Sequence, residues 1–167
     1  MHDFKINIQI QTRYQNKELE SLLRQIALTT LSNFFQIQRH TLSIDIIISN
    51  DTLLHNLNQE FMGEDSTTDV LAFPAKSSKS DPSYSVNSQI QLLSPDNNHI
   101  YLGEVYLSYP QAKKQAKQHH HSLDHEITTL IVHGILHILG FDHINIKENF
   151  EMEQATKFLL NQIINKG

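Results

Sequence analysis

Apolar and polar residues alternate along residues 4–12, so that Phe4, Ile6, Ile8 and Ile10 face one side of an extended chain. This period of two predicts a half-buried β-strand. Short apolar runs predict further strands at residues 42–49, 69–73 and 100–107. Apolar residues three or four apart predict amphipathic helices at residues 18–35, 108–117, 122–139 and 148–164.

Local signals mark the ends of the helices. They are a cap at Asn50 or Asp51 before a short helix with Leu53, Leu54 and Leu57, a first-turn proline at Pro110, a cap at Ser122 and a closing glycine at Gly140. Strands and helices mix throughout the chain. The sequence therefore predicts the α/β (α+β) class, with one small mixed β-sheet packed by about five helices.

The domain organisation is simple. We expect one domain over residues 1–167, because no linker or internal repeat divides the chain. Residues 75–98 are rich in serine and contain Pro82 and Pro95, which predicts a loosely structured excursion. Within it, residues 86–93 are the candidate for a hairpin arm that pairs with the strand at 100–107.

Composition narrows the class of protein. Of 167 residues, 39% are hydrophobic and 19% charged, which is typical of a globular domain and excludes collagen and full disorder. The absence of cysteine excludes disulfide scaffolds, zinc–thiolate fingers and thiol catalysis, and the net charge of −5 excludes a globally basic nucleic-acid coat. No secretory signal or spanning stretch is visible, so we expect a soluble, cytoplasmic protein. The unusual count is 11 histidines.

A group of these histidines lies in residues 133–143, whose sequence is HGILHILGFDH. His133 and His137 are four residues apart on a predicted helix, which places both imidazoles on one face. Gly140 ends the helix, and His143 can then return as a third ligand. Three neutral nitrogen ligands suit zinc and leave a fourth position open, as in catalytic sites. We predict one Zn²⁺ per chain at this helix end; nickel and other divalent ions accept the same ligands.

A hydrogen-bonded core residue is the ordinary alternative for a single histidine on an apolar helix. Two at this spacing, on a helix otherwise made of Ile, Leu, Val and Gly, favour a metal, because burying both without partners would be costly. The spacing is that of the zinc-protease motif HExxHxxGxxH, but Gly134 replaces the glutamate that acts as general base. This argues against peptide hydrolysis. Gly134 can instead let another backbone or a substrate approach closely.

The same segment resembles the signature of the YbeY family of bacterial endoribonucleases, which are ribosomal RNA maturation factors. Sequence blocks upstream also resemble the family and occur in the family's order. Together with the signature they cover most of the chain from about residue 42 to 155. These blocks are Leu57-Asn58, TDVLAFP at residues 68–74, LGEVYLS at 102–108, and Glu126 with Leu130.

The resemblance implies a metal-dependent RNase that cuts single-stranded RNA. The cellular roles that the resemblance implies are maturation of ribosomal RNA, chiefly the 3′ end of the small-subunit RNA, and ribosome quality control. It also implies that His133, His137 and His143 are the zinc ligands, in a cleft between a small sheet and its helices.

Three positions depart from the family's pattern. Met62 stands where the family usually has an arginine in a YRGK run, so an apolar thioether replaces a cation that would steer phosphate. This change affects how strongly the protein binds RNA. As an apolar residue, Met62 is itself expected to pack in the core. Ala72 replaces a common serine and Glu104 a common aspartate.

Residues for proton transfer are not assigned by the pattern. Asp142, beside the third histidine, and Glu126, two helical turns before the first, are the candidates. Asp142 can equally orient an imidazole, and Glu126 can be a solvated or ion-paired helix residue. Water and the RNA's own 2′-hydroxyl are both compatible nucleophiles. Asp69 is interpreted as a structural turn or cap residue.

Positive charge for binding phosphate is concentrated at one place. Lys113, Lys114 and Lys117 precede the run His119-His120-His121. The alternative, which we favour, is a solvated helix face followed by a polar turn. Because adjacent residues point to different faces, we do not expect a dedicated metal site within this run.

Three functions are compatible with these features. The first is a zinc-dependent endoribonuclease whose partners are single-stranded or ribosomal RNA, the small subunit and assembly factors. The second is a zinc hydrolase of another substrate, against which the missing glutamate argues. The third is a non-catalytic ribosome-assembly factor whose zinc only stabilises a small fold.

Overall fold

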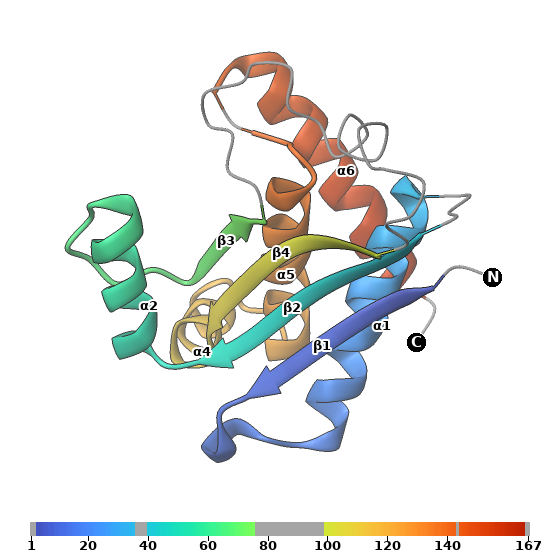
Figure 1. Cartoon of the computed structure of the whole chain (residues 1–167). Coiled ribbons are helices and arrows are strands. Elements are labelled where there is room, and N and C mark those ends of the chain that lie inside the picture. The colour runs from blue at the N-terminus through green and yellow to red at the C-terminus, as the bar shows by residue number, and fades with distance from the viewer. Residues whose placement is uncertain (1–2, 36–39, 76–98, 143, 166–167) are drawn as a thin grey trace.

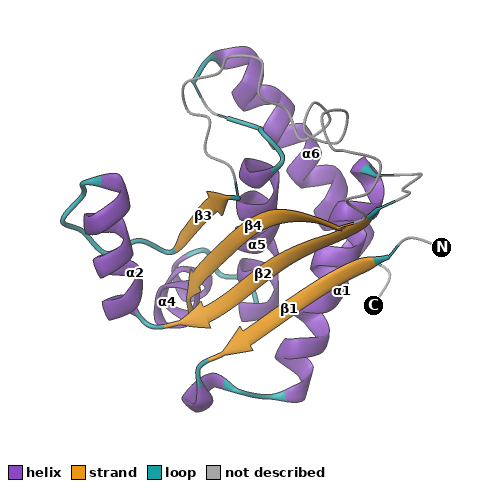
Figure 2. Cartoon of the chain, in the orientation of Figure 1, coloured by secondary structure: helices purple, strands orange, loops and turns teal. Residues whose placement is uncertain are grey.

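Four β-strands form one mixed sheet (Figure 2). The computed structural model describes residues 3–35, 40–75, 99–142 and 144–165. The strands β1 (Phe4–Ile10), β2 (Thr41–Ser49) and β4 (His99–Ser108) run parallel, while β3 (Val70–Pro74) is antiparallel to β4. Their order across the sheet is β1-β2-β4-β3, so β3 forms one edge.

Helices cover one face of this sheet (Figure 1). The described residues form five α-helices, α1 (Lys17–Phe34), α2 (Asp51–Leu57), α4 (Tyr109–Gln118), α5 (Leu123–Ile138) and α6 (Ile146–Ile164), with a 3₁₀ turn η1 (Thr12–Tyr14) and a π-helical turn η2 (Asn58–Met62). Helix α5 lies at the centre, where it contacts α1, α4, α6, β3 and β4. A small mixed sheet packed by five helices confirms the predicted fold class.

The predicted helix ends are confirmed by capping bonds. The Ser122 side chain accepts a hydrogen bond from the backbone N–H of His125 at 3.1 Å, and Asn50, rather than Asp51, caps α2. Gly140 has a φ of +97° after α5. The N–H of Phe141 donates to the carbonyl of Leu136 at 3.0 Å, which is the Schellman closure that a left-handed residue permits.

Two helices begin earlier than their apolar pattern predicts. Asn16 caps α1, which therefore starts at Lys17, and Asn145 caps α6, which starts at Ile146. In both cases the side-chain oxygen accepts a backbone N–H three residues later. A capping side chain, not the first apolar residue, sets where a helix begins.

A polar network lies along β2 and β4. The Tyr101 hydroxyl donates to Asp45 at 2.9 Å and to Glu104 at 3.4 Å, and the Tyr106 hydroxyl donates to Glu104 at 2.8 Å. Burial, and then the hydrogen bond to Glu104, raise the pKa of Tyr106 to about 12. Burial and the hydrogen bond to Asp45 raise the pKa of Tyr101 further. Both phenols therefore stay protonated as donors, which gives Glu104 a structural role between them.

Some predictions fall outside the described residues. Of the predicted excursion at 75–98, only Ala75 is described, and the proposed hairpin arm at 86–93 lies outside altogether. Among the helices that are described, none combines the length and hydrophobicity needed to cross a membrane.

Candidate metal centre

His133 and His137 meet on the last two turns of α5. Their Nε2 atoms are 3.0 Å apart, and their rings stand at 74° with centroids 4.6 Å apart. Both residues are half-buried, on a helix whose other faces lie in the core. His143, the third predicted ligand, lies outside the described residues.

The two described histidines fit a zinc ion. Ligand atoms about 2.0–2.1 Å from a tetrahedral ion stand roughly 3.3 Å from one another. The 3.0 Å separation of the two Nε2 atoms is close to this spacing. Two neutral imidazoles can also hydrogen-bond to each other at this distance, so the pair is compatible with the protein both with and without metal.

Gly134 faces the sheet. A Cβ atom placed there would lie 2.6 Å from Cγ1 of Val105 on β4 and 3.4 Å from Cγ2 of Val70 on β3. The sequence predicted that another backbone or a substrate approaches Gly134, but the atoms that approach it are side chains of these two valines. The position that holds the general base in zinc proteases is therefore used here to pack α5 against β3 and β4.

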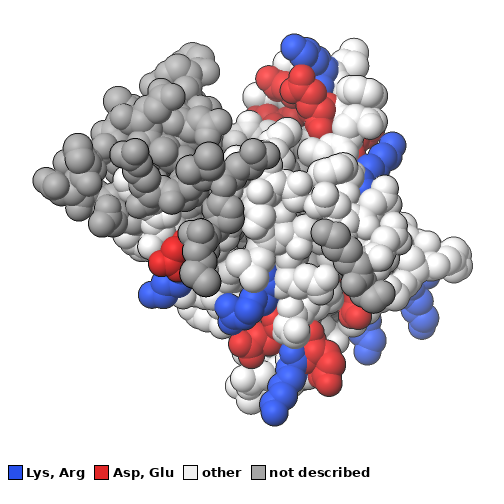
Figure 3. Space-filling model, turned by 90° about the vertical axis from the view of Figure 1, so that its right-hand side faces the viewer, with Lys and Arg blue, Asp and Glu red and all other residues white. Residues whose placement is uncertain are grey.

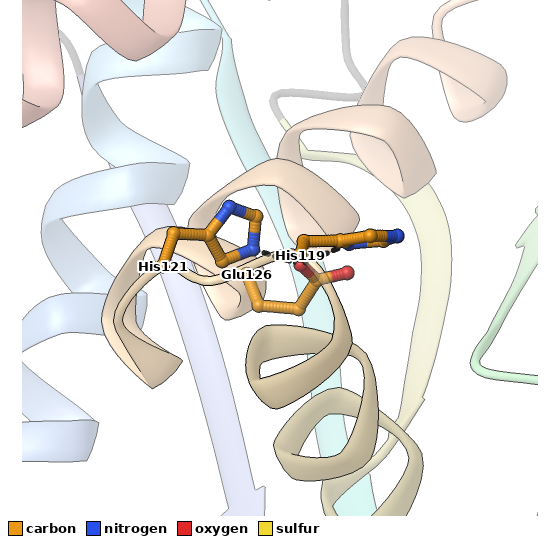
Figure 4. Close-up of side chains that lie close together, drawn as sticks. All are labelled: His119, His121 and Glu126. Carbon is orange, nitrogen blue, oxygen red and sulfur yellow. Dashed lines mark hydrogen bonds and ion pairs between the residues drawn. The ribbon is translucent and has the colours of Figure 1, made fainter.

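Glu126 lies at the other end of α5 from the histidine pair. It is 4% exposed, and its Oε2 atom contacts Nδ1 of His119 at 3.3 Å and Nε2 of His121 (Figure 4). Seven helical residues separate it from His133, a rise of about 10 Å along the axis. These contacts do not place Glu126 at the His133–His137 pair, where it was a candidate for proton transfer. Asp142, the other candidate, is exposed just after α5.

The contacts of Glu126 depend on how α4 ends. His120 has a φ of +57°, and the N–H of His121 donates to the carbonyl of Ala116 at 3.1 Å. This Schellman closure reverses the chain and brings the rings of His119 and His121 to the same carboxylate, with centroids 5.4 Å apart. The expectation that adjacent histidines point to different faces is wrong for these two. His119, His121 and Glu126 form a group that can hold a metal ion.

Residues of the upstream blocks fix the neighbouring loops. The buried Asn58 donates from Nδ2 to the carbonyl of Ser66 at 3.0 Å, which ties η2 to the segment before β3. Asp69 accepts from the N–H of Val70 at 2.7 Å and from Nε2 of Gln115 at 2.9 Å, which links the start of β3 to α4. Both side chains hold backbone in place, as predicted for Asp69.

The candidate RNA-contacting residues are exposed. Met62, at the end of η2, is 39% exposed, so the expectation that it packs in the core is wrong. Lys113, Lys114 and Lys117 are exposed on α4, whose buried residues are Ala112 and Ala116. The lysines thus occupy a solvated helix face, and they remain accessible to a ligand.

Comparisons with known proteins place the chain in one family. The family described as "Endoribonuclease YbeY" matches residues 5–164. Two relatives with that name come from Dehalococcoides mccartyi, 33% identical over 95% of this chain and 90% of its own length, and Caldicellulosiruptor saccharolyticus, 31% identical over 90% of each chain. A solution structure from Thermotoga maritima has the same fold, with a TM-score of 0.58 and 23% identity over 97% of this chain and 91% of its own. The match over nearly the whole chain shows that this protein belongs to the YbeY endoribonuclease family.

Proposed function

We propose that the chain is a zinc-dependent endoribonuclease specific for single-stranded RNA. It acts in ribosomal RNA processing, chiefly maturation of the small-subunit 3′ end, and in ribosome quality control. It works in the cytoplasm as one domain, with ribosomal RNA, the small subunit and assembly factors as partners. Family membership supports the substrate class, and the convergence of His133 and His137 supports the metal dependence.

In this proposal His133, His137 and His143 hold the zinc ion. A zinc ion supplies a Lewis acid that can polarise a phosphoryl oxygen and stabilise the negative charge that develops during phosphodiester cleavage. The protein's own contribution is positioning. Helix α5 holds two imidazoles on one face, and the closure at Gly140 ends the helix three residues after the second histidine. The absence of a side chain at Gly134 lets α5 pack closely against Val105 of the sheet.

The charges of the described surface are mixed. On the face in Figure 3, basic and acidic side chains lie next to one another. Two of the described ion pairs, Arg24–Glu20 and Lys147–Glu151, lie along single helices at i,i+4 spacing and neutralise cations that could otherwise bind phosphate. Since affinity for RNA comes mainly from phosphate contacts, we expect binding to be modest and to rely on local cations such as those of α4.

Removing a proposed ligand should abolish RNA cleavage. We expect His133→Ala and His137→Ala to lose the zinc of this centre and to cut single-stranded RNA at least about 100-fold more slowly, because even outer-sphere changes at metal sites cost about 10–100-fold. The measurements are metal content of the purified protein and cleavage of a labelled single-stranded RNA. The matched control is His99→Ala. His99 is exposed and belongs neither to the His133–His137 pair nor to the group around Glu126, so this variant should behave as wild type.

Different results would support different functions. Equal cleavage by wild type and by His133→Ala would identify the activity as a contaminant. Zinc binding without any cleavage would support the non-catalytic assembly factor. Retention of zinc by His137→Ala, at this centre, would contradict the ligand assignment.

Restoring a cation at position 62 should strengthen the engagement of RNA. Met62 is exposed, so Met62→Arg places a guanidinium in solvent without burying charge. One added phosphate contact should steepen the dependence of log affinity on log salt by about 0.7 for a single strand. Binding and cleavage are measured across a salt series. The control Phe158→Arg adds the same charge at another exposed apolar position, on α6. Equal slopes for both variants would show that position 62 does not contact phosphate.

A further inference from the structure

Glu126 is an ionisable group buried between two helices. Its side chain is 5% exposed, and its ion-pair partners among the described residues are His119 and His121. A buried carboxylate requires a compensating positive charge, and neutral imidazoles do not supply one. If Glu126 carries its charge, that compensation comes from a proton on a histidine or from a bound cation.

The three side chains are close enough together to hold one metal ion. Nδ1 of His119, Nε2 of His121 and an oxygen of Glu126 all lie within 4.8 Å of one another. The 3.3 Å separation of His119 Nδ1 and Glu126 Oε2 matches the spacing of about 3.3 Å expected for two ligands of a tetrahedral zinc ion. His121 Nε2 lies closer to the same oxygen, so these two atoms would have to move apart when an ion binds. Two imidazoles with one carboxylate are a ligand set that zinc accepts. Figure 4 shows both rings directed at the carboxylate.

The surroundings favour binding over a chance contact. The ring of His125 lies 4.4 Å from that of His121 at an interplanar angle of 32°, which restricts the His121 ring. The closure at His120 fixes the backbone on both sides. The side chain of His119 is 57% exposed, so an ion can enter from solvent and keep water in the remaining coordination position.

We propose that His119, His121 and Glu126 form a second divalent transition-metal site, of the zinc type, that joins the C-terminal end of α4 to the first turn of α5. The site is separate from the His133–His137 pair and does not rest on the proposed ribonuclease function. Its role is to stabilise the α4–α5 connection, because a ligand that binds only the folded chain raises its stability by mass action.

The test uses the full chain with His133→Ala and His137→Ala, which removes the other centre. Titration with ZnCl₂, followed by calorimetry, should still show one equivalent bound, and zinc should raise the melting temperature. Adding Glu126→Gln, which keeps the shape but removes the charged ligand, should weaken binding at least about tenfold and abolish the thermal shift. His119→Gln should also weaken binding, and it leaves the buried His121–Glu126 contact in place if Glu126→Gln fails to fold.

His120→Gly is the matched control. It removes the neighbouring histidine, which is not a proposed ligand, and it relieves a left-handed conformation that is unfavourable for a residue with a Cβ. We expect it to bind zinc as tightly as the background variant and to be more stable. If zinc binding survives both Glu126→Gln and His119→Gln, or is lost in His120→Gly, the ions bind exposed histidines adventitiously and the proposal is wrong.

Discussion

Substituting glutamate for Gly134 should prevent stable folding, and it should not create a peptidase. The first added atom already lies 2.6 Å from a methyl of Val105, which is fully buried. Overpacking of this kind costs about 1–3 kcal/mol. A carboxyl group buried there without a partner adds about 2–7 kcal/mol even if it takes up a proton, the cost of an unpaired neutral polar group, and more if it stays ionised. Together these costs approach the total stability of a domain, about 5–15 kcal/mol. Urea unfolding and a peptidase assay measure both parts of the prediction.

A double-mutant cycle identifies the clash. Gly134→Ala alone adds one methyl against Val105, and the gain in helix propensity of about 1 kcal/mol partly offsets the strain. In a Val105→Ala background the opposing methyls are gone, so the same change at Gly134 should become neutral or stabilising. If Gly134→Ala has the same effect in both backgrounds, contact with Val105 is not what excludes a side chain at position 134.

Packing explains why the zinc-protease spacing occurs here with a glycine in place of the general base. Position 134 follows His133 directly, and on α5 it points at Val105 and Val70 in the sheet. A glutamate there would have to displace β4 before it could act on a substrate. The sequence alone excluded the general base because glycine cannot transfer a proton. The structure adds that the base cannot be restored by a single substitution.

Much of the fold could be predicted because its signals are local. The alternation in β1, the caps at Asn50 and Ser122 and the first-turn Pro110 are properties of a few neighbouring residues. The sheet order and the antiparallel direction of β3 are not local. They depend on which strands pair across gaps of tens of residues, and no residue pattern within β3 encodes its partner.

The two histidine groups also differ in whether a local sequence signal predicts them. His133 and His137 could be predicted to converge because helical spacing alone places them together. The group around Glu126 could not, because it needs the chain to reverse at a residue with positive φ. Such a residue is usually a glycine, as Gly140 is after α5, but after α4 it is His120. The one available signal was a glutamate a few residues after a histidine run.

Substituting alanine for Gly103 should destabilise the chain by about 2–6 kcal/mol, because strain and overpacking each cost about 1–3 kcal/mol. Gly103 has a φ of +138°, and it follows a bulge where β4 carries one more residue than β2. An added Cβ would overlap the carbonyl oxygen of Phe73 and lie 2.9 Å from Cα of Pro74. These are backbone atoms of β3, so no side-chain rotation can relieve the contact, and β3 would have to separate from β4.

Gly63→Ala separates this clash from the cost of backbone conformation. Gly63 also has a positive φ, +72°, but a Cβ there would meet nothing within 4 Å. It should therefore lose only about 1–2 kcal/mol, the cost of a left-handed residue. Urea unfolding of both variants measures the difference. Because α5 packs on β3 and β4, separation of the two strands by Gly103→Ala should also weaken the zinc binding proposed for His133 and His137. Equal losses of stability in the two variants would show that β3 is not held against Gly103 in solution.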